Sequence, residues 1–232
     1  MPRIAARITK DGWGHKGGPF FLAWQLGPGY QALDMHAPAG DPGTRGTVLL
    51  ARKAFVEKRH GPLAWRRVLA RLPGADRCIL EGQLLPISWY PLALNLRLDD
   101  AIASELSPDH RDQIFLDMGR MSAEVNLKGS HAAWVRPGDP HYLLGQAPVI
   151  YRFYYSRGHR TYTQLSDTSG VLRTYDAESV TRTDCLTVCG WYQRAIELCG
   201  GREVAVRETQ CRSGGAAHCE YLCAWAMRGG RP

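Results

Sequence analysis

The sequence predicts an α+β domain in which a helical layer packs on a four-stranded antiparallel sheet. Apolar residues recur every three or four positions between residues 47 and 153, and from residue 161 they alternate with polar ones. One helical segment interrupts the alternating part, so the expected order is helices, hairpin, helix, hairpin. The 232 residues, 44% hydrophobic and 22% charged, suffice for one core and exclude a disordered or coiled-coil chain.

The first 45 residues are rich in glycine and proline, which predicts a loosely packed N-terminal arm at residues 1–45. A single α+β domain at residues 46–228 follows, and it opens with helices. Capping residues or prolines precede each apolar period, so we expect helices to begin at Thr47, at Gly61–Pro62, at Ser88, at Ser107–Pro108 and at Asp139–Pro140.

The second part of the domain contains the strands. Residues 161–165 and 170–175 alternate on either side of a Ser-Asp-Thr-Ser-Gly turn, which predicts the first hairpin. A helix follows from a cap at Thr183 or Asp184 and ends at Gly200, because glycine suits the left-handed residue after a helix. Residues 203–209 and 219–227 alternate again and form the second hairpin.

The charge is positive but scattered: 29 Lys and Arg against 22 Asp and Glu give +7. The densest basic group is Arg52, Lys53, Lys58, Arg59, Arg66 and Arg67. Apolar residues interrupt it at helical spacing, so we interpret it as a solvated helical face and expect no specific nucleic-acid binding. No apolar run approaches the roughly 18 residues that span a bilayer, and the N-terminus lacks the apolar stretch of a signal peptide. The sequence therefore predicts a cytoplasmic protein.

Six of the seven cysteines lie after residue 184, and an odd count in such a chain argues against a disulfide framework. In the last hairpin, Glu208-x-x-Cys211 is followed after seven residues by Cys219, so three donors flank one turn. Cys185 begins the preceding helix, whose N-terminus favours a thiolate. Three thiolates and one carboxylate would complete a tetrahedral Zn²⁺ site.

The alternative for these cysteines is packing as small buried side chains, which we expect of Cys189, Cys199 and Cys223. His218 adjoins Cys219, but neighbours on a strand point to opposite faces. His218 would therefore ligate the metal only if Glu208 were displaced.

The segment from Cys185 to Trp225, with its Glu-x-x-Cys, seven-residue gap and Cys-Glu-Tyr ending, resembles the zinc-binding half of the 4-vinyl-reductase domain family. That family is related in fold to the TRAPP vesicle-tethering subunits and includes small-molecule sensor domains. Ser-Trp-Tyr-Pro at 88–91 and Gly-Arg-x-x-Ala-Glu at 119–124 resemble uncharacterised bacterial paralogues common in myxobacteria. The resemblance implies that Cys185, Glu208, Cys211 and Cys219 hold zinc.

The resemblance also implies a function. It suggests a non-catalytic sensor or scaffold module with structural zinc, which binds a small apolar or aromatic ligand and acts through an unidentified protein partner. The sequence contains no nucleophile elbow, phosphate loop or dinucleotide fingerprint, which favours a non-enzymatic role. Two alternatives stay open: a reductase-like enzyme of the 4-vinyl-reductase type, and a purely structural interaction subunit without a ligand.

Large aromatic side chains between the helical layer and the first hairpin predict the wall of an apolar ligand cavity, with plain core packing as the alternative. The candidates are Trp89, Tyr90, Tyr151, Phe153 and Tyr162. The helices between residues 47 and 106 carry more apolar surface than one sheet face can cover, including Trp65, Leu84, Leu85, Trp89, Leu92 and Leu96. Surplus apolar surface usually marks a partner, so we predict a homodimer.

Overall fold

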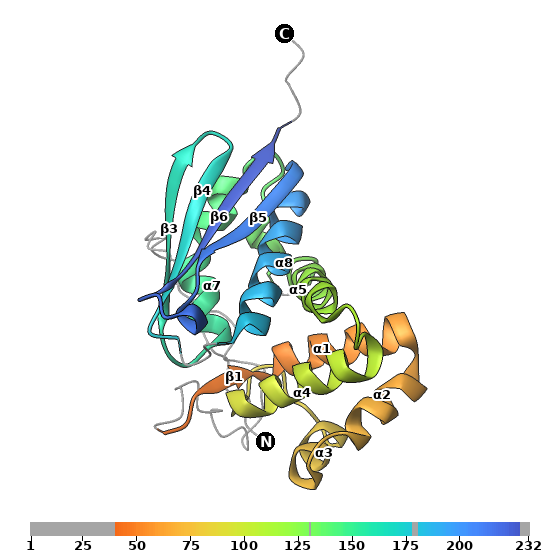
Figure 1. Cartoon of the computed structure of the whole chain (residues 1–232). Helices are drawn as coiled ribbons and strands as arrows, with labels where there is room; N and C mark the ends of the chain where they lie inside the picture. The colour runs from red at the N-terminus through yellow and green to blue at the C-terminus, as the bar shows by residue number, and fades with distance from the viewer. Residues whose placement is uncertain (1–39, 130, 178–180, 228–232) are drawn as a thin grey trace, which may run out of the picture. The chain divides into compact units, whose positions relative to one another are not determined.

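The computed structural model describes residues 40–129, 131–177 and 181–227, which belong to one compact unit. Its first half is helical and comprises α1 (Gly46–His60), α2 (Pro62–Ala70), α3 (Gly74–Glu81) and α4 (Leu92–Leu106). A short antiparallel ribbon joins the starts of α1 and α4, because β1 (Gly43–Arg45) pairs with β2 (Trp89–Pro91). Helix α5 (Arg111–Leu127) then leads from this half to the second (Figure 1).

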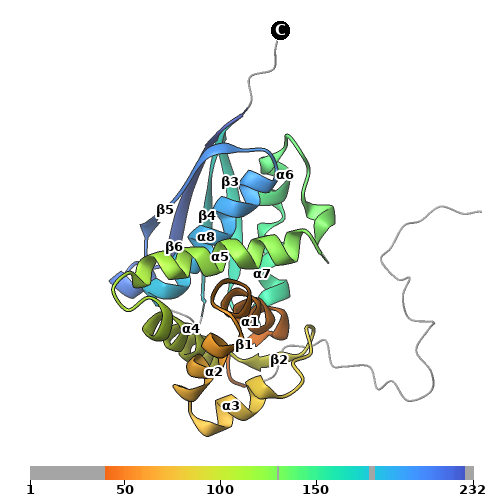
Figure 2. The ribbon, with the colours of Figure 1, turned by 90° about the vertical axis from the view of Figure 1, so that its right-hand side faces the viewer.

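The second half contains the sheet. Its elements are the 3-10 turn Ala132–Trp134, α6 (Pro140–Gly145), α7 (Ala147–Tyr154), β3 (His159–Ser166), β4 (Ser169–Tyr175), α8 (Arg182–Leu198), β5 (Arg202–Gln210) and β6 (Cys219–Ala226). The strand order is β3-β4-β6-β5, antiparallel throughout. Helices α7 and α8 cover one face of this sheet (Figure 2). The α+β class and the four-stranded antiparallel sheet are confirmed.

Helices α5 and α8 form the most extensive helix–helix contact, and two glycines make it possible. A Cβ atom at Gly119 would lie 2.1 Å from the carbonyl oxygen of Thr187. A Cβ atom at Gly190 would lie 2.0 Å from the carbonyl oxygen of Leu116. Because these neighbours are backbone atoms, the two helices can approach this closely only where both residues lack a side chain.

Two large hydrophobic cores and a small cluster of Val48, Ile150 and Tyr154 surround this helix pair. The first fills the space between α1, α2, α4 and α5, with Phe55 and Phe115 each 1% exposed. The second lies between α8 and the sheet and includes the buried thiols of Cys189, Cys199 and Cys223. The cysteines expected to pack as small apolar side chains are therefore in the second core.

The structure differs from the expected helix boundaries at several places. Residues 89–91 form β2, so the third expected helix begins at Leu92 and not at Ser88. The expected helix from Pro140 to residue 157 divides at Gln146 into α6 and α7, because Pro148 cannot donate the backbone hydrogen bond that would continue α6. Helix α3 has only two turns and no expected counterpart.

One basic residue expected on a solvated face is instead deep in the protein. The Nε atom of Arg52 lies 2.6 Å from Oδ1 of Asp99, and Nη2 lies 3.1 Å from Oδ2. Both side chains are 3% exposed. The buried face of α1 therefore contains a charged residue, Arg52, among its apolar side chains, and Asp99 on α4 pairs with it.

Within the described residues, no helix is both long and apolar enough to cross a membrane. The expected arm at residues 1–45 lies almost wholly outside the described part of the chain. Its last three residues form β1 and belong to the folded unit.

Candidate functional site

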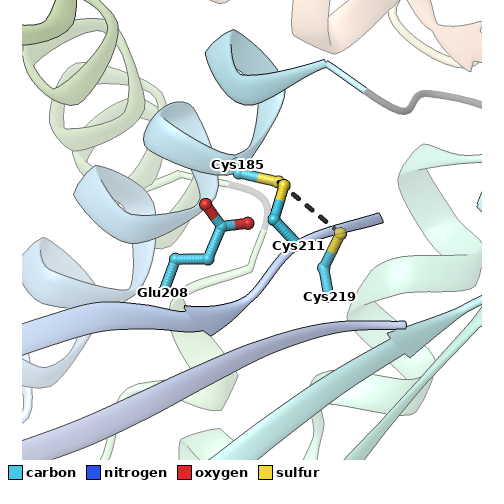
Figure 3. A group of neighbouring side chains, drawn as sticks. All are labelled: Cys185, Glu208, Cys211 and Cys219. Carbon is cyan, nitrogen blue, oxygen red and sulfur yellow. Dashed lines mark hydrogen bonds between the residues drawn. The ribbon is translucent and has the colours of Figure 1, made fainter. Parts of the chain in front are cut away.

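Three elements bring Cys185, Glu208, Cys211 and Cys219 together (Figure 3). Cys185 lies in the first turn of α8, Glu208 near the end of β5, Cys211 just after β5, and Cys219 at the start of β6. One sulfur or carboxylate oxygen atom from each residue lies within 4.8 Å of the others. The structure thus places in one cluster all four residues that the sequence selected as metal ligands.

The distances in this cluster suit a shared central ion better than a disulfide. The Sγ of Cys185 lies 3.6 Å from that of Cys219 and 3.8 Å from that of Cys211, whereas a disulfide requires about 2.05 Å. A tetrahedral ion with metal–sulfur bonds of about 2.3 Å separates its sulfur ligands by roughly 3.8 Å. The Oε1 atom of Glu208 is buried and has no hydrogen-bond partner within the described residues.

A hydrogen bond joins the two buried thiols of the cluster, with Cys185 donating to Cys219 at 3.6 Å. A hydrogen bond from Cys185 lowers the pKa of Cys219, and the backbone N–H of Arg212, 3.4 Å from that sulfur, contributes in the same direction. The same hydrogen bond, together with burial, raises the pKa of Cys185. The cluster therefore favours one thiolate at Cys219.

A separate cavity of about 50 Å³ lies where α1, α5, α7 and α8 meet the sheet. Its apolar wall consists of Val48, Ile150, Val188 and Trp191. We call this the first cavity. A second cavity of about 20 Å³ reaches Asp184, Cys185 and Cys219, and it shares Arg160 and Tyr151 with the first.

Arg160 is the charged group common to both cavities. It lies on β3 and is 6% exposed. Its Nε donates to Oγ1 of Thr174 at 2.8 Å and its Nη1 to the hydroxyl of Tyr192 at 3.4 Å, while the rings of Tyr151, Tyr192 and Tyr221 surround the guanidinium at 5.0 to 5.8 Å. Burial opposes the charge, but the facing tyrosine hydroxyls keep the pKa of Arg160 above its ordinary value.

Tyr154 also lines the first cavity. Tyr154 is 6% exposed, and its hydroxyl has no hydrogen-bond partner among the described residues. Burial raises the pKa of Tyr154, so the hydroxyl keeps its proton. The ring of His131 stacks on that of Trp134 at 4.3 Å and meets the ring of Tyr154 edge-on. Burial lowers the pKa of His131.

Of the five aromatic residues expected to form a ligand wall, Tyr151 lines the two cavities described above, and the other four lie in other surroundings. Trp89 packs against the guanidinium of Arg45, and the hydroxyl of Tyr90 accepts a hydrogen bond from the backbone of Leu85. Phe153 meets the ring of His131, and the hydroxyl of Tyr162 lies 2.5 Å from Nδ1 of His141.

Sequence reasoning missed most of the residues that line the first cavity. Ile150, Tyr151 and Tyr154 share one face of α7, and Thr187, Val188 and Trp191 share one face of α8. Their spacing of three and four residues indicates one face of a helix, but ordinary core residues have the same spacing, so the sequence does not distinguish a cavity wall from a packed core.

Solved structures with this fold include several H-NOX proteins, each less than 25% identical to the chain. One from S. oneidensis, in the Fe(II)NO ligation state, is 16% identical with a TM-score of 0.62, and the match covers 78% of this chain and 99% of that one. The Fe(II) unliganded H-NOX protein from K. algicida is 10% identical with a TM-score of 0.61, covering 81% and 100%. An oxygen-binding H-NOX domain related to soluble guanylate cyclases is 8% identical with a TM-score of 0.60, covering 81% and 98%.

No family model matches the sequence, and no curated protein matches it. The likeness to H-NOX structures concerns the fold.

These neighbours contradict the resemblance to the 4-vinyl-reductase family and to TRAPP subunits. The resemblance rested on short motifs at residues 88–91, 119–124 and 185–225, whereas the fold match spans about 80% of the chain. The zinc cofactor implied by that resemblance is wrong for the same reason, because the matching structures are described with Fe(II), NO, oxygen or heme.

Proposed function

We propose that this chain is a non-catalytic sensor module that binds a small molecule in the first cavity and acts through protein partners. The first cavity is the observation that carries the proposal. It touches α1, α5, α7, α8 and β3, so a molecule held there contacts both halves of the fold at once. The fold itself is shared with H-NOX proteins solved in NO and oxygen complexes.

Haem does not fit the first cavity. Pockets for ligands of drug size have volumes of about 300–1,000 Å³, and the first cavity has about 50 Å³. No histidine is among its lining residues, and the ring of His131 instead meets the ring of Tyr154 edge-on. The charged side chains of Arg52 and Arg160 border the same space. We therefore propose that the first cavity holds a small ligand and no macrocycle.

The rival function is a structural interaction subunit whose cavity holds only water. Native mass spectrometry of the purified full chain, combined with thermal unfolding against a panel of small molecules, separates the two. A ligand that binds only the folded state stabilises it by RT ln(1 + [L]/Kd), so a true ligand raises Tm in proportion to the logarithm of its concentration. A panel without any such rise would support the structural subunit.

We further propose that Cys185, Glu208, Cys211 and Cys219 form a metal-ion site that fixes α8 to the β5–β6 hairpin. The sulfur spacing and the unpartnered oxygen of Glu208 support it. Elemental analysis of protein purified without chelator should find about one metal ion per chain and should identify it. Cys211→Ser should lose that ion, whereas Cys78→Ser, which alters an exposed thiol elsewhere, should keep it. Metal-free wild-type protein would contradict the site.

The single domain at residues 46–228, the cytoplasmic location and the homodimer stay predictions. Of the apolar residues expected at a dimer interface, Trp65, Leu84 and Leu92 are buried in the protein's own core. Exposed apolar side chains in the helical half, Leu63 at 65% and Ile87 at 42%, support the homodimer. Light scattering that reports the mass of one chain at micromolar concentration would contradict it.

A further inference from the structure

Two buried arginines line the first cavity, and among the described residues only Arg52 forms a direct ion pair; the acidic group that interacts with Arg160 is Asp184, which is not within ion-pair distance. Arg52 is held by Asp99 through two hydrogen bonds. Arg160 is equally buried, but it forms no ion pair with any carboxylate in the described part of the chain. A buried charge without a counter-ion is costly, typically by several kcal/mol. This cost is removed if a bound ligand supplies the negative charge.

The hydrogen-bonding groups that remain open point to the same chemistry. The described contacts of Arg160 use Nε and Nη1, so the N–H groups of Nη2 have no partner among the described residues. The hydroxyl of Tyr154 is likewise unpartnered. A guanidinium can only donate hydrogen bonds, and a tyrosine hydroxyl can donate one. Arg160 and Tyr154 can therefore donate hydrogen bonds to a ligand that carries hydrogen-bond acceptors.

The rest of the first cavity limits the size and shape of the ligand. Val48, Ile150 and Val188 provide an aliphatic wall, and Trp191 closes it. A water-sized group occupies about 10–15 Å³ by this measure, so about 50 Å³ accommodates roughly three to five non-hydrogen atoms.

We propose that the first cavity binds a small carboxylate, whose oxygens accept hydrogen bonds from Arg160 and Tyr154 and whose short alkyl group packs against Val48, Ile150 and Val188. This inference rests on the proposed function that the first cavity is a ligand site, and it assigns the chemical class of that ligand.

Asp184 is the competing counter-ion. It lines the second cavity and is absent from the lining of the first. No ion pair joins it to Arg160 in the described residues, and its Oδ1 has no hydrogen-bond partner there. A water-bridged contact between the two groups would satisfy Arg160 without a ligand, and the experiment must distinguish this case.

The experiment compares acids with amides of the same shape. The full-length chain is titrated with acetate, propionate, acetamide and propionamide at matched ionic strength, and binding is followed by thermal unfolding and calorimetry. We expect saturable binding of acetate and propionate, with the amides at least tenfold weaker because they lack the charge. Sodium chloride at equal ionic strength should have no saturable effect.

Variants locate the binding in the first cavity. Tyr154→Phe removes one hydroxyl and should raise the Kd of propionate roughly three- to tenfold. Arg160→Met should abolish binding. Their controls are Tyr142→Phe and Arg152→Met, which alter a tyrosine and an exposed arginine that do not line the first cavity. The controls should bind propionate as the wild type does.

The outcomes distinguish two claims: that the first cavity is a ligand site, and that its ligand is a carboxylate. Equal binding of acid and amide would overturn the carboxylate inference and leave the small-molecule sensor standing. Binding that survives in both Tyr154→Phe and Arg160→Met would overturn the proposed position. If no compound binds, both the inference and the use of the first cavity as a ligand site fail, and the contact with Asp184 is favoured.

Discussion

Removing one partner of the Arg52–Asp99 pair should destabilise the protein far more than removing both. Asp99→Ala leaves the guanidinium of Arg52 buried, at 3% exposure, and without its two hydrogen bonds. Breaking a buried pair in this way typically costs about 3–5 kcal/mol. A domain of this kind has about 5–15 kcal/mol of stability, so the variant should be close to unfolding.

The double variant Arg52→Met/Asp99→Leu replaces both charges with apolar side chains of similar size. Such replacements are often neutral or stabilising, so we expect it to lie within about 1 kcal/mol of the wild type. Urea unfolding measures all three variants from the midpoint at constant slope. The matched control is Asp117→Ala, which breaks an exposed pair with Arg59 (46% and 29% exposed) and should cost less than about 1 kcal/mol.

Two results would refute this reasoning. If Asp99→Ala cost no more than Asp117→Ala, Arg52 would not be buried as described. If the double variant were no more stable than Asp99→Ala, removing both charges would not relieve the buried guanidinium, and the two residues would not be coupled.

Two further predictions concern the helix contact and pH. Gly119→Ala should destabilise the protein by about 1–3 kcal/mol or more, because its Cβ would meet the carbonyl of Thr187 on α8. The control is Gly145→Ala, which has open space around the new Cβ. Equal stability of the two variants in urea would contradict the close packing of α5 on α8. Burial lowers the pKa of His131, so the unfolded chain binds a proton more readily than the folded one; stability should be complete above the ordinary value of 6.5 and fall as the pH decreases through it. His131→Phe keeps a ring on Trp134 and should flatten the decrease in Tm between about pH 7 and 5, whereas an unchanged slope would assign that decrease to other groups.

The parts of the fold that could be predicted are those with a local cause. The alternation of residues 203–209 and 219–227 defines two strands, and the turn between them brings Glu208, Cys211 and Cys219 together. Cys185 joins them because α8 packs on this hairpin. The cluster thus follows from spacing alone, although the family to which it was attributed was wrong.

The parts that could not be predicted depend on partners far apart in the sequence. Arg52 and Asp99 are 47 positions apart, and each has a charge that suggests solvent. Arg160 precedes the strand expected at residues 161–165 and resembles an exposed basic residue in the sequence, but it lies on β3 and is buried. Tertiary packing decides whether a charged group is buried, and the spacing of apolar residues along a single helix does not predict it.

A crystal structure of the full chain grown in propionate would locate the ligand. We expect propionate in the first cavity, with its carboxylate within hydrogen-bond distance of Nη2 of Arg160 and the hydroxyl of Tyr154, and its alkyl end against Val48 and Ile150. A first cavity that holds only water, with Arg160 turned toward Asp184, would contradict this expectation.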